Sequence, residues 1–483
     1  MRTTKNNKKF KFYVSVILIA TLVLTCFSAC KVEKSTRSLI VSGDVENEVT
    51  ITSTDGFKTQ KIKIKDASYD GILASDLIAK AGVYGDGSVI LHGADGVMAE
   101  IPLSQLDNTC FLAMTENGWQ FNGETLPKQT RIKNIDKIIV KSNEILEKQR
   151  CFRTIHEDLG KTYSFGELFL KEKEVHSVLE GQPKLNGKTA NSMTKRELIS
   201  LETLFGELSQ GDFENAVGYF EDGSEKSLDG GYIEVRGNSV DYIGDDKKTR
   251  VENLLGVWFD PPQSVANLND YILKEIPTKK VMLIELDGLG FYSLIENQKI
   301  SSKYQIDKMR TVAPSISNVA LATILTGKSP FETGILSRKD RTLKCDDIFV
   351  SLNKLGKTSV VVEGDSKLIN LSIDQILNID QNGNGTNDDE VFESGMKNCD
   401  NDFVFIHFHG FDDVAHNDAP SSNIAKAKIE TLWEYVEKLA ENFDGSVIVT
   451  ADHGQRDTPN SDKKGTHGEF FPRDMTIPFV IVK

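Results

Sequence analysis

The sequence predicts an α/β protein, and three observations in its last two hundred residues lead to this class. Four continuous apolar runs occur there, at residues 281–286, 358–362, 403–408 and 446–450. Helical stretches separate the runs, and each run ends in polar residues. Runs that are apolar on both faces are typical of a parallel sheet that helices cover on both sides. We therefore expect residues 276–483 to form a domain with a mostly parallel sheet covered by helices on both faces.

The 483 residues exceed the roughly 250–300 that one hydrophobic core spans, so further domains are expected. Residues 31–145 contain short strands, for example at 39–41, 49–52, 62–64 and 89–91, with a turn at Asp95-Gly96 and one helix over 72–81. This pattern predicts a β-rich accessory module. Residues 146–275 are predicted to be a mixed α+β region. Two of its helices are indicated by capping boxes, Ser164 with Glu167 and Thr194 with Glu197, and strands are expected near 232–235 and 240–243.

Residues 1–30 have the order of a signal peptide. A basic stretch precedes an uncharged run with an apolar centre, and small residues come directly before Cys30. This end resembles the lipoprotein box of bacteria, which implies acylation of Cys30, although Phe27 stands where an aliphatic residue is usual. An uncleaved anchor helix is the alternative, because the run nearly spans a bilayer. Either interpretation predicts an extracytoplasmic protein that is anchored to the cell membrane.

Charge and cysteine usage exclude some classes of protein. The net charge of −14 gives no global positive field, so we expect no genomic nucleic acid as a partner. Outside the signal, Cys110, Cys151, Cys345 and Cys399 are scattered and form no metal-binding pair or disulfide framework. Whether these four cysteines form one or two disulfide bridges is left open by the sequence.

Histidines and carboxylates gather where the apolar runs end. Five of the eight histidines lie within residues 407–467, together with Asp412, Asp413 and Asp452. Imidazole and carboxylate are the ligands of Zn²⁺ and neighbouring transition metals. Because ligands of parallel sheets bind at the carboxyl ends of the strands, we expect a metal site at this edge.

The motifs of this part, in their order, resemble the alkaline phosphatase superfamily, and in particular its type I phosphodiesterase/nucleotide pyrophosphatase branch. They are Asp287-Gly288-Leu289-Gly290, Pro314-Ser315-Ile316-Ser317, Asp412 with His416, Asp452-His453-Gly454, and His467-Gly468. The resemblance covers residues 279–483 and implies an alkaline phosphatase-like fold with two divalent metal ions, Zn²⁺ or alternatively Mn²⁺. It implies that one ion is held by Asp287, Ser317, Asp452 and His453, and the other by Asp412, His416 and His467.

The same resemblance assigns the nucleophile to Ser317 rather than to Ser315. Ser317 is the third residue after Pro314 and lies ten residues before Gly327, as in that family. The residue three positions after Ser317 is Ala320, where the family usually has Asn. Asn318 is therefore the candidate to bind the substrate as an oxyanion donor. This departure leaves the preference for phosphate diesters or monoesters open.

Three further signals surround these motifs. Asp380, Asn382 and Asn384 stand at the first three ligand positions of a calcium loop, but position 12 is Val391, so bound Ca²⁺ and a plain acidic turn both remain. The P-loop-like run 322–329 lacks the first Gly and ends a helix, so we reject it. His407 and His409 alternate on a strand and share a face, with His409 nearer the site.

Together, these features predict a two-metal hydrolase of phosphate esters that acts through a phosphoserine intermediate at the outer cell surface. Its substrate would be a small-molecule or cell-envelope phosphate ester. One alternative is a metal-dependent transferase that passes the phosphoryl-bearing group to an envelope acceptor. Another is a non-catalytic envelope lipoprotein that binds partners.

Overall fold

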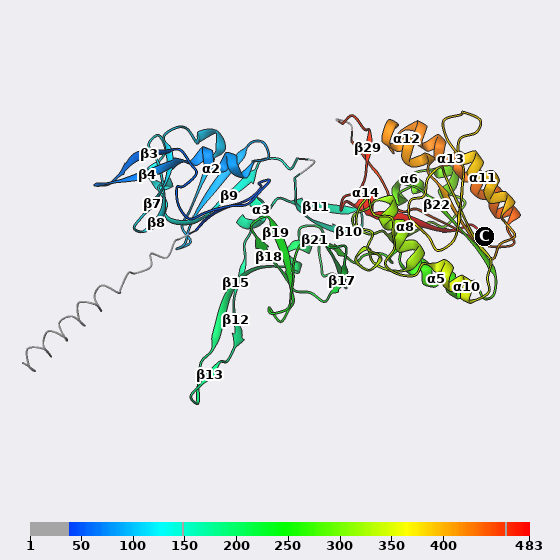
Figure 1. The fold of residues 1–483 in the computed structure, drawn as a ribbon, viewed down its shortest axis with the longest axis horizontal. Helices are drawn as coiled ribbons and strands as arrows, with labels where there is room; N and C mark the ends of the chain where they lie inside the picture. Colours follow the sequence, from blue (N-terminus) through cyan, green and yellow to red (C-terminus); the bar gives the residue numbers. More distant parts are fainter. Residues whose placement is uncertain (1–37, 147–148, 459–460) are drawn as a thin grey trace, which may run out of the picture. The chain divides into compact units, whose positions relative to one another are not determined.

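The structure is a computed structural model that describes residues 38–146, 149–458 and 461–483 (Figure 1). The predicted lipoprotein signal, residues 1–30, lies outside the described residues. The chain divides into two compact units. Among the described residues, the first comprises residues 38–42 with Asn47–Val83 and Gly87–Ile139, and the second comprises Gly43–Glu46, Tyr84–Asp86 and the described residues of Val140–Lys483. The domain boundaries at residues 145 and 275 stay predictions.

The first unit is built on a nine-stranded, largely antiparallel sheet with the order β2-β1-β9-β8-β7-β4-β3, with β5 pairing to β9 and β6 to β5. Helix α2 begins at Ala74, two residues later than predicted, because Ile72 and Leu73 still pair with β7. The turn at Asp95-Gly96 is present, with Gly96 at a φ of 85°. The elements are β1 (Leu39–Gly43), β2 (Val49–Ile51), β3 (Thr59–Ile64), β4 (Ala67–Leu73), α2 (Ala74–Ala81), β5 (Gly87–Gly93), β6 (Met98–Pro102), β7 (Cys110–Thr115), β8 (Gly118–Gly123) and β9 (Lys133–Ser142).

The second unit begins with two five-stranded sheets, ordered β11-β10-β21-β16-β17 and β12-β15-β18-β19-β20. Apolar side chains from both sheets and from helices α3 and α4 share one buried cluster. The elements are β10 (Phe152–His156), β11 (Leu159–Tyr163), α3 (Phe165–Leu170), β12 (Glu174–Gly181), β13 (Lys184–Leu185), β14 (Lys188–Thr189), β15 (Ser192–Ser200), α4 (Leu201–Phe205), β16 (Ala216–Phe220), β17 (Glu225–Leu228), β18 (Tyr232–Arg236), β19 (Ser239–Ile243), β20 (Arg250–Val251) and β21 (Leu254–Phe259).

One of the two predicted helix starts in this region is wrong. Ser164 caps α3 as expected, with its Oγ accepting from the Glu167 N–H at 3.1 Å. Thr194 and Glu197, however, lie inside strand β15, where they pair with Val178 and Val175 of β12. The antiparallel ladder satisfies their backbone groups, and helix α4 begins only at Leu201, capped by Ser200.

The rest of the second unit contains a seven-stranded sheet with the order β23-β30-β27-β22-β26-β24-β25. The five strands from β27 to β25 are parallel, whereas β30 runs antiparallel to its neighbours β27 and β23. The four apolar runs of the sequence are β22, β24, β26 and β27, so the predicted fold class is confirmed. The strands are β22 (Lys280–Leu286), β23 (Asp307–Arg310), β24 (Ser359–Glu363), β25 (Gln375–Leu377), β26 (Phe403–Phe408), β27 (Gly445–Thr450), β28 (Arg456–Asp457), β29 (Gly465–Thr466) and β30 (Thr476–Ile481).

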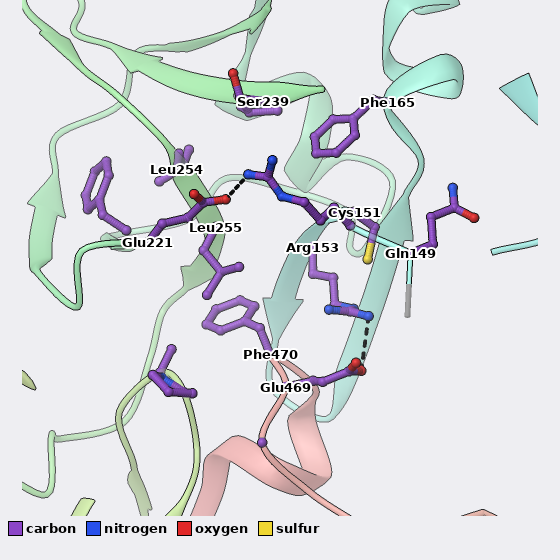
Figure 2. A pocket seen from close by; sticks show the side chains of 16 residues that line it. Gln149, Cys151, Arg153, Phe165, Glu221, Ser239, Leu254, Leu255, Glu469 and Phe470 are labelled. Atoms are coloured by element: carbon purple, nitrogen blue, oxygen red, sulfur yellow. Dashed lines mark hydrogen bonds and ion pairs between the residues drawn. The ribbon is translucent and has the colours of Figure 1, made fainter. Parts of the chain in front are cut away.

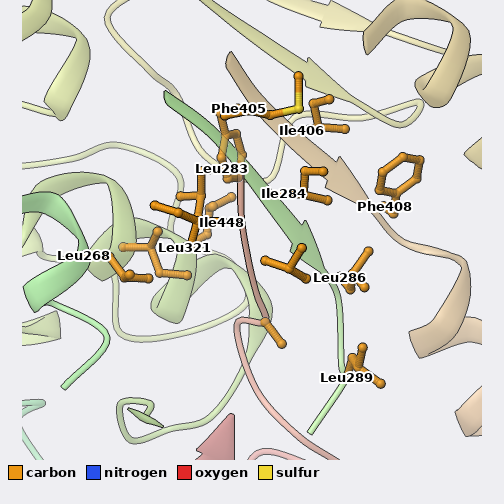
Figure 3. Packing of buried hydrophobic residues seen from close by; sticks show 14 of the residues in the cluster. Leu268, Leu283, Ile284, Leu286, Leu289, Leu321, Phe405, Ile406, Phe408 and Ile448 are labelled. Carbon is orange, nitrogen blue, oxygen red and sulfur yellow. The ribbon is translucent and has the colours of Figure 1, made fainter. Parts of the chain in front are cut away.

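Helices cover both faces of this sheet (Figure 1). Helices α5, α8 and α10 form one layer, and α11, α12 and α13 form the other. Figure 3 shows the apolar core between the sheet and the first layer, where Leu268 and Leu321 meet Leu283 and Ile448. The helices are α5 (Asn267–Glu275), α6 (Phe291–Ile295), α7 (Gln298–Ser301), α8 (Ser317–Thr326), α9 (Pro330–Thr333), α10 (Ile348–Lys354), α11 (Asp388–Lys397), α12 (Gly410–Asp418), α13 (Asn423–Asn442) and α14 (Pro472–Met475).

Two predictions about the chain as a whole can be compared with the structure. Cys110, Cys151, Cys345 and Cys399 are all free thiols, so the disulfide bridges left open by the sequence do not form. Within the described ranges, no helix is both long and apolar enough to span a membrane.

Candidate metal centre

The centre is built where three neighbouring parallel strands end. Asp287 follows β22, His409 follows β26, and Asp452 with His453 follows β27. Because β22 lies between β26 and β27, these side chains meet at one edge of the sheet. Asp287, Asp452 and His453 are almost completely buried there.

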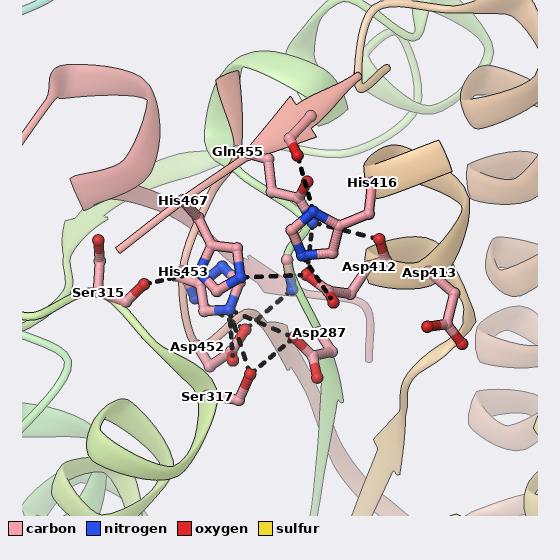
Figure 4. A network of polar contacts seen from close by, with 12 residues as sticks. Asp287, Ser315, Ser317, Asp412, Asp413, His416, Asp452, His453, Gln455 and His467 are labelled. Carbon is pink, nitrogen blue, oxygen red and sulfur yellow. Dashed lines mark hydrogen bonds and ion pairs between the residues drawn. The ribbon is translucent and has the colours of Figure 1, made fainter. Parts of the chain in front are cut away.

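The first predicted ligand set comes together around Ser317 (Figure 4). The Ser317 Oγ lies 3.3 Å from Asp287 Oδ1 and 3.2 Å from His453 Nε2. The His453 Nε2 lies 3.4 Å from Asp287 Oδ1 and 3.2 Å from Asp452 Oδ2. Ligand atoms of Asp287, Asp452 and His453 all lie within 4.8 Å of one another, so they are close enough together to bind one shared ion.

The second predicted set lies beside the first. Asp412 and His416 are one turn apart on α12, and their Oδ2 and Nε2 are separated by 3.4 Å. His467, which follows β29, places its Nε2 3.7 Å from Asp412 Oδ1. The rings of His467 and His453 stack with centroids 3.7 Å apart, so the two sets are adjacent. The structure thus brings together the residues of both predicted sets.

The hydrogen bonds of the three histidines fit a metal. The Nδ1 atoms of His416, His453 and His467 lie 2.7, 3.1 and 2.9 Å from the backbone carbonyls of Gly465, Gly454 and Ser315. A ring that donates from Nδ1 to a carbonyl keeps the lone pair on Nε2, and all three Nε2 atoms face the centre. The buried Asp452 Oδ2 has no hydrogen-bond partner. The three Nε2 lone pairs and the Asp452 Oδ2 are thus available as ligand atoms for a divalent ion.

The electrostatics of the centre also favour cations. Burial raises the pKa of Asp412 to about 7, and the negative charge of Asp287 adds to the rise. Burial likewise raises the pKa of Asp452. Burial would raise the pKa of Asp287 too, but His409, His407 and His453 outweigh it and hold that pKa well below its usual range. Several carboxylates packed away from water repel one another, and a divalent cation relieves the repulsion.

His407 of β26 and His409, which directly follows this strand, complete the surroundings of Asp287. His409 Nδ1 lies 2.5 Å from Asp287 Oδ2, and Asp287 raises the pKa of His409 to about 10. His407, buried behind it, places Nε2 3.3 Å from the same oxygen and 3.2 Å from Glu285 Oε2. Sequence reasoning missed Glu285, although an acidic residue inside an apolar strand was a visible signal.

Two polar residues beside the second set were also missed. Gln455 donates from Nε2 to Asp412 Oδ1 at 2.5 Å, and Arg338 lies with Nη2 3.0 Å from His467 Nε2. Gln455 could have been noticed from its place two residues after His453. Nothing in the sequence around Arg338 signals a role, because the turn that carries it is placed by tertiary contacts.

The side chain of Asn318, the predicted oxyanion donor, is bonded elsewhere in this structure, and its role in substrate binding stays a prediction. Its Nδ2 donates to the carbonyls of Ser337 at 2.7 Å and Asp340 at 2.9 Å, so both amide hydrogens are used. Ser315 is also occupied. Its carbonyl accepts from His467, and its buried Oγ donates to the Glu469 carbonyl at 3.2 Å. Of the two candidate serines, Ser317 is the one whose Oγ contacts the first ligand set (Figure 4).

The loop with the calcium pattern is closed by its own donors. The Asp380 carboxylate accepts the backbone N–H groups of Gly383, Asn384 and Gly385, and the amides of Asn382 and Asn384 donate to Asp389. Calcium at Asp380, Asn382 and Asn384 stays a prediction.

A cavity of about 590 Å³ lies in the same unit (Figure 2). Its walls include Pro314 and Gly468, the neighbours of Ser315 and His467, together with apolar side chains from the first two sheets of this unit. Arg150 is paired with Glu221, and Arg153 with Glu469 at 3.2 Å, so the charges on its walls are already neutralised. None of the predicted metal ligands lines this cavity.

Comparison with protein families agrees with this geometry. The model of the Metalloenzyme superfamily matches residues 364–468, a segment that contributes Asp412, His416, Asp452, His453 and His467 to the centre. Residues 364–468 are therefore similar to this superfamily, which agrees with the predicted resemblance to alkaline phosphatase-like enzymes. No curated protein matches the chain.

Several solved structures are similar to part of the chain. Phosphonoacetate hydrolase from Sinorhizobium meliloti 1021, in complex with phosphonoformate, is 17% identical with a TM-score of 0.31, over 37% of this chain and 56% of that one. An inactive variant of murine ectonucleotide pyrophosphatase/phosphodiesterase 5, in complex with AMP, is 11% identical with a TM-score of 0.33, over 42% and 87%. A 2-O GAG sulfatase is 12% identical with a TM-score of 0.31, over 42% and 64%.

Proposed function

We propose that the protein is a two-metal hydrolase of phosphate esters in which Ser317 is the nucleophile. The observation that carries the proposal is the position of the Ser317 Oγ, 3.3 Å from Asp287 and 3.2 Å from His453 in the first ligand set, with the second set adjacent to it. Such a pair of sets suits the clamping of both attacking and leaving oxygens during displacement at phosphorus.

The chain's own residues prepare Ser317 for attack. Ser317 is the first residue of α8, whose free backbone N–H groups favour negative charge at this end. Asp287 and His453 fix the direction of its hydroxyl. Bound divalent ions would lower the pKa of this hydroxyl and neutralise the charge on the phosphoryl oxygens.

The reaction then has two displacements. The Ser317 Oγ forms a bond to phosphorus, its proton passes to water, and the bond from phosphorus to the leaving oxygen breaks. The leaving alcohol takes up a proton from water. In the second displacement a water oxygen attacks phosphorus and gives up a proton to solvent, and the bond to Ser317 Oγ breaks as this oxygen takes up a proton. A monoester substrate then releases phosphate, and a diester releases a phosphate monoester.

We further propose Zn²⁺ as the metal, with Mn²⁺ as the alternative, and a small-molecule or envelope phosphate ester as the substrate. The imidazole and carboxylate donors support this choice of ions. The order of residues 1–30 supports a site of action outside the cytoplasm, with the chain held to the membrane by a lipid on Cys30.

Hydrolysis of aryl phosphate monoesters and diesters by the purified protein tests the proposal. We expect release of the aryl alcohol that stops after chelation and returns with Zn²⁺ or Mn²⁺. Quenching in acid and mass spectrometry should find phosphate on the peptide that contains Ser317. Product that forms only when an acceptor alcohol is added would identify a transferase. If metal-replete protein shows neither turnover nor a phosphopeptide, the hydrolase proposal fails and the alternative of a non-catalytic binding protein is favoured.

A further inference from the structure

A short turn next to the nucleophile carries an arginine into the centre. Residues 337–340 form this turn, closed by the Asp340 N–H donating to the Ser337 carbonyl at 3.1 Å. The Asp340 carboxylate accepts from the Ser337 N–H and Oγ at 2.8 and 2.9 Å. Asn318, the residue after Ser317 on α8, donates to the carbonyls at both ends of the turn. The nucleophile and the turn are therefore held together by a single buried amide.

The side chain that this turn presents is Arg338. Its Nη2 lies 3.0 Å from His467 Nε2, and Arg338 as a whole is exposed, as are Ser337 and Lys339 beside it. In the part of the chain that the structure describes, no carboxylate pairs with Arg338 within 4.0 Å. A guanidinium that contacts a candidate metal ligand and has no carboxylate partner is free to bind another anion.

The contact with His467 also shows what a bound ion would change. The Nε2 lone pair that now accepts from Arg338 is the one that a metal would take. A guanidinium has no lone pair to share and is repelled by a neighbouring cation. Its N–H donors then need an acceptor that carries negative charge, and an anion bound at the centre supplies one.

We propose that Arg338 binds the phosphoryl oxygens of the substrate and makes the enzyme prefer phosphate monoesters to diesters. This inference rests on the proposed function and gives it a substrate class. Arg binds phosphate through two parallel N–H···O bonds, and such charge-assisted bonds are stronger than neutral ones. A monoester has three unesterified oxygens and two negative charges, whereas a diester has two such oxygens and one charge. The diester therefore leaves fewer acceptors for Arg338 beyond those that the metal ions take. Asn318 is the positioning residue of this arrangement.

Binding of inorganic phosphate to the metal-replete protein tests the inference independently of turnover. By calorimetry, Arg338→Ala should weaken phosphate binding by about ten- to a hundred-fold, the loss expected for hydrogen bonds to a charged group. Metal content should stay at the unmodified level. In the absence of phosphate, Arg338→Ala should bind Zn²⁺ at least as tightly, because a competitor for His467 Nε2 is gone. Lys339→Ala, at the next position of the same turn, is the matched control and should change neither quantity.

The ratio of kcat/KM for an aryl monoester to that for the matching diester supplies the second measurement. Arg338→Ala should lower this ratio about ten-fold or more, and Arg338→Lys should restore only part of it, because an ammonium cannot bind with two parallel bonds. Phosphate affinity and ratio both within two-fold of the unmodified protein would overturn the inference. If phosphate binding depends on Arg338 but no ester is cleaved, the anion site stands and the hydrolase proposal fails instead.

Discussion

Single atoms decide what the candidate ligands are able to do. His416, His453 and His467 each use Nδ1 on a backbone carbonyl, which fixes the ring and turns Nε2 inward. Burial, and then the neighbouring His453, lowers the pKa of His467 to about 2, so this ring stays neutral. A neutral imidazole of fixed orientation is ready to bind a metal without first losing a proton.

Ser317→Ala is expected to reduce turnover by several orders of magnitude while metal binding is retained. The nucleophile is lost, but Asp287, Asp452 and His453 still surround the first site. Steady-state kinetics with an aryl phosphate and metal analysis of the same sample measure both effects. Ser315→Ala is the control. It should cost far less because the Ser315 carbonyl, which holds His467, is unchanged. Near-normal activity in both variants would exclude the serine mechanism.

His467→Ala is expected to release one of two bound transition-metal ions. It removes one of three ligands from the second set and leaves the first set complete. Metal analysis after gel filtration should fall from two ions per chain to one, and His416→Ala should behave in the same way. Two ions retained in both variants would show that the ligand sets are assigned wrongly.

At the scale of elements, one carboxylate joins three segments of the region before the parallel sheet. Glu207, just after α4, accepts from the Tyr163 hydroxyl of β11 at 2.9 Å. It is also paired with Lys161 at 2.6 Å and with Lys171, which follows α3. Burial would raise the pKa of Glu207, but these three partners outweigh it and lower that pKa to about 2.

The depressed pKa of Glu207 predicts a pH-dependent contribution to stability. The contribution is present above the ordinary pKa of 4.5 and is lost as the pH falls toward 2, because the folded state holds the proton less tightly. Glu207→Gln should therefore lower the free energy of unfolding by about 1–3 kcal/mol at pH 7. The difference should shrink between pH 4.5 and pH 2. Urea denaturation at several pH values measures it, with the exposed Glu172→Gln as the control, expected within about 0.5 kcal/mol of the unmodified protein. An equal deficit at pH 7 and at pH 2 would contradict this account.

At the scale of the whole molecule, the metal centre connects segments that are far apart in the sequence. Its ligands come from β22, α8, α12, β27 and the residue after β29. Without a cation, buried carboxylates of the centre face one another, and burial raises the pKa of Glu285, beside Asp452, well above its usual range. Besides their part in the proposed reaction, the ions would therefore stabilise the folded state of the second unit.

Chelation is expected to lower the midpoint of thermal unfolding, and Zn²⁺ should restore it. Free ion at a hundred times its dissociation constant stabilises the folded state by about 2.7 kcal/mol per site. Differential scanning calorimetry before and after chelation measures the change. The variant His467→Ala is the control and should gain less on addition of Zn²⁺ because it has lost one site. Identical unfolding with and without metal would contradict a centre that connects these segments.

The sequence by itself determined the parallel sheet and predicted which residues gather in the candidate metal centre. Strands such as 281–286 and 403–408 are buried on both faces, so their apolar runs are visible without any knowledge of their neighbours. Their ends place Asp287, Asp452 and His453 at one edge, whatever the details of packing. Local pattern and spacing are sufficient for these features.

Only the tertiary structure decided the roles of residues whose partners lie far along the chain. Thr194 and Glu197 carry a helix-start pattern, but pairing with β12 holds them in a strand because the ladder satisfies their backbone groups along its length. The sequence shows no partner for the Asn318 side-chain amide, whereas in the structure this amide donates hydrogen bonds to the carbonyls of Ser337 and Asp340. Those two bonds also bring Arg338 to His467. Hydrogen bonds depend on distance in space rather than in sequence, and no local pattern records which donor meets which acceptor.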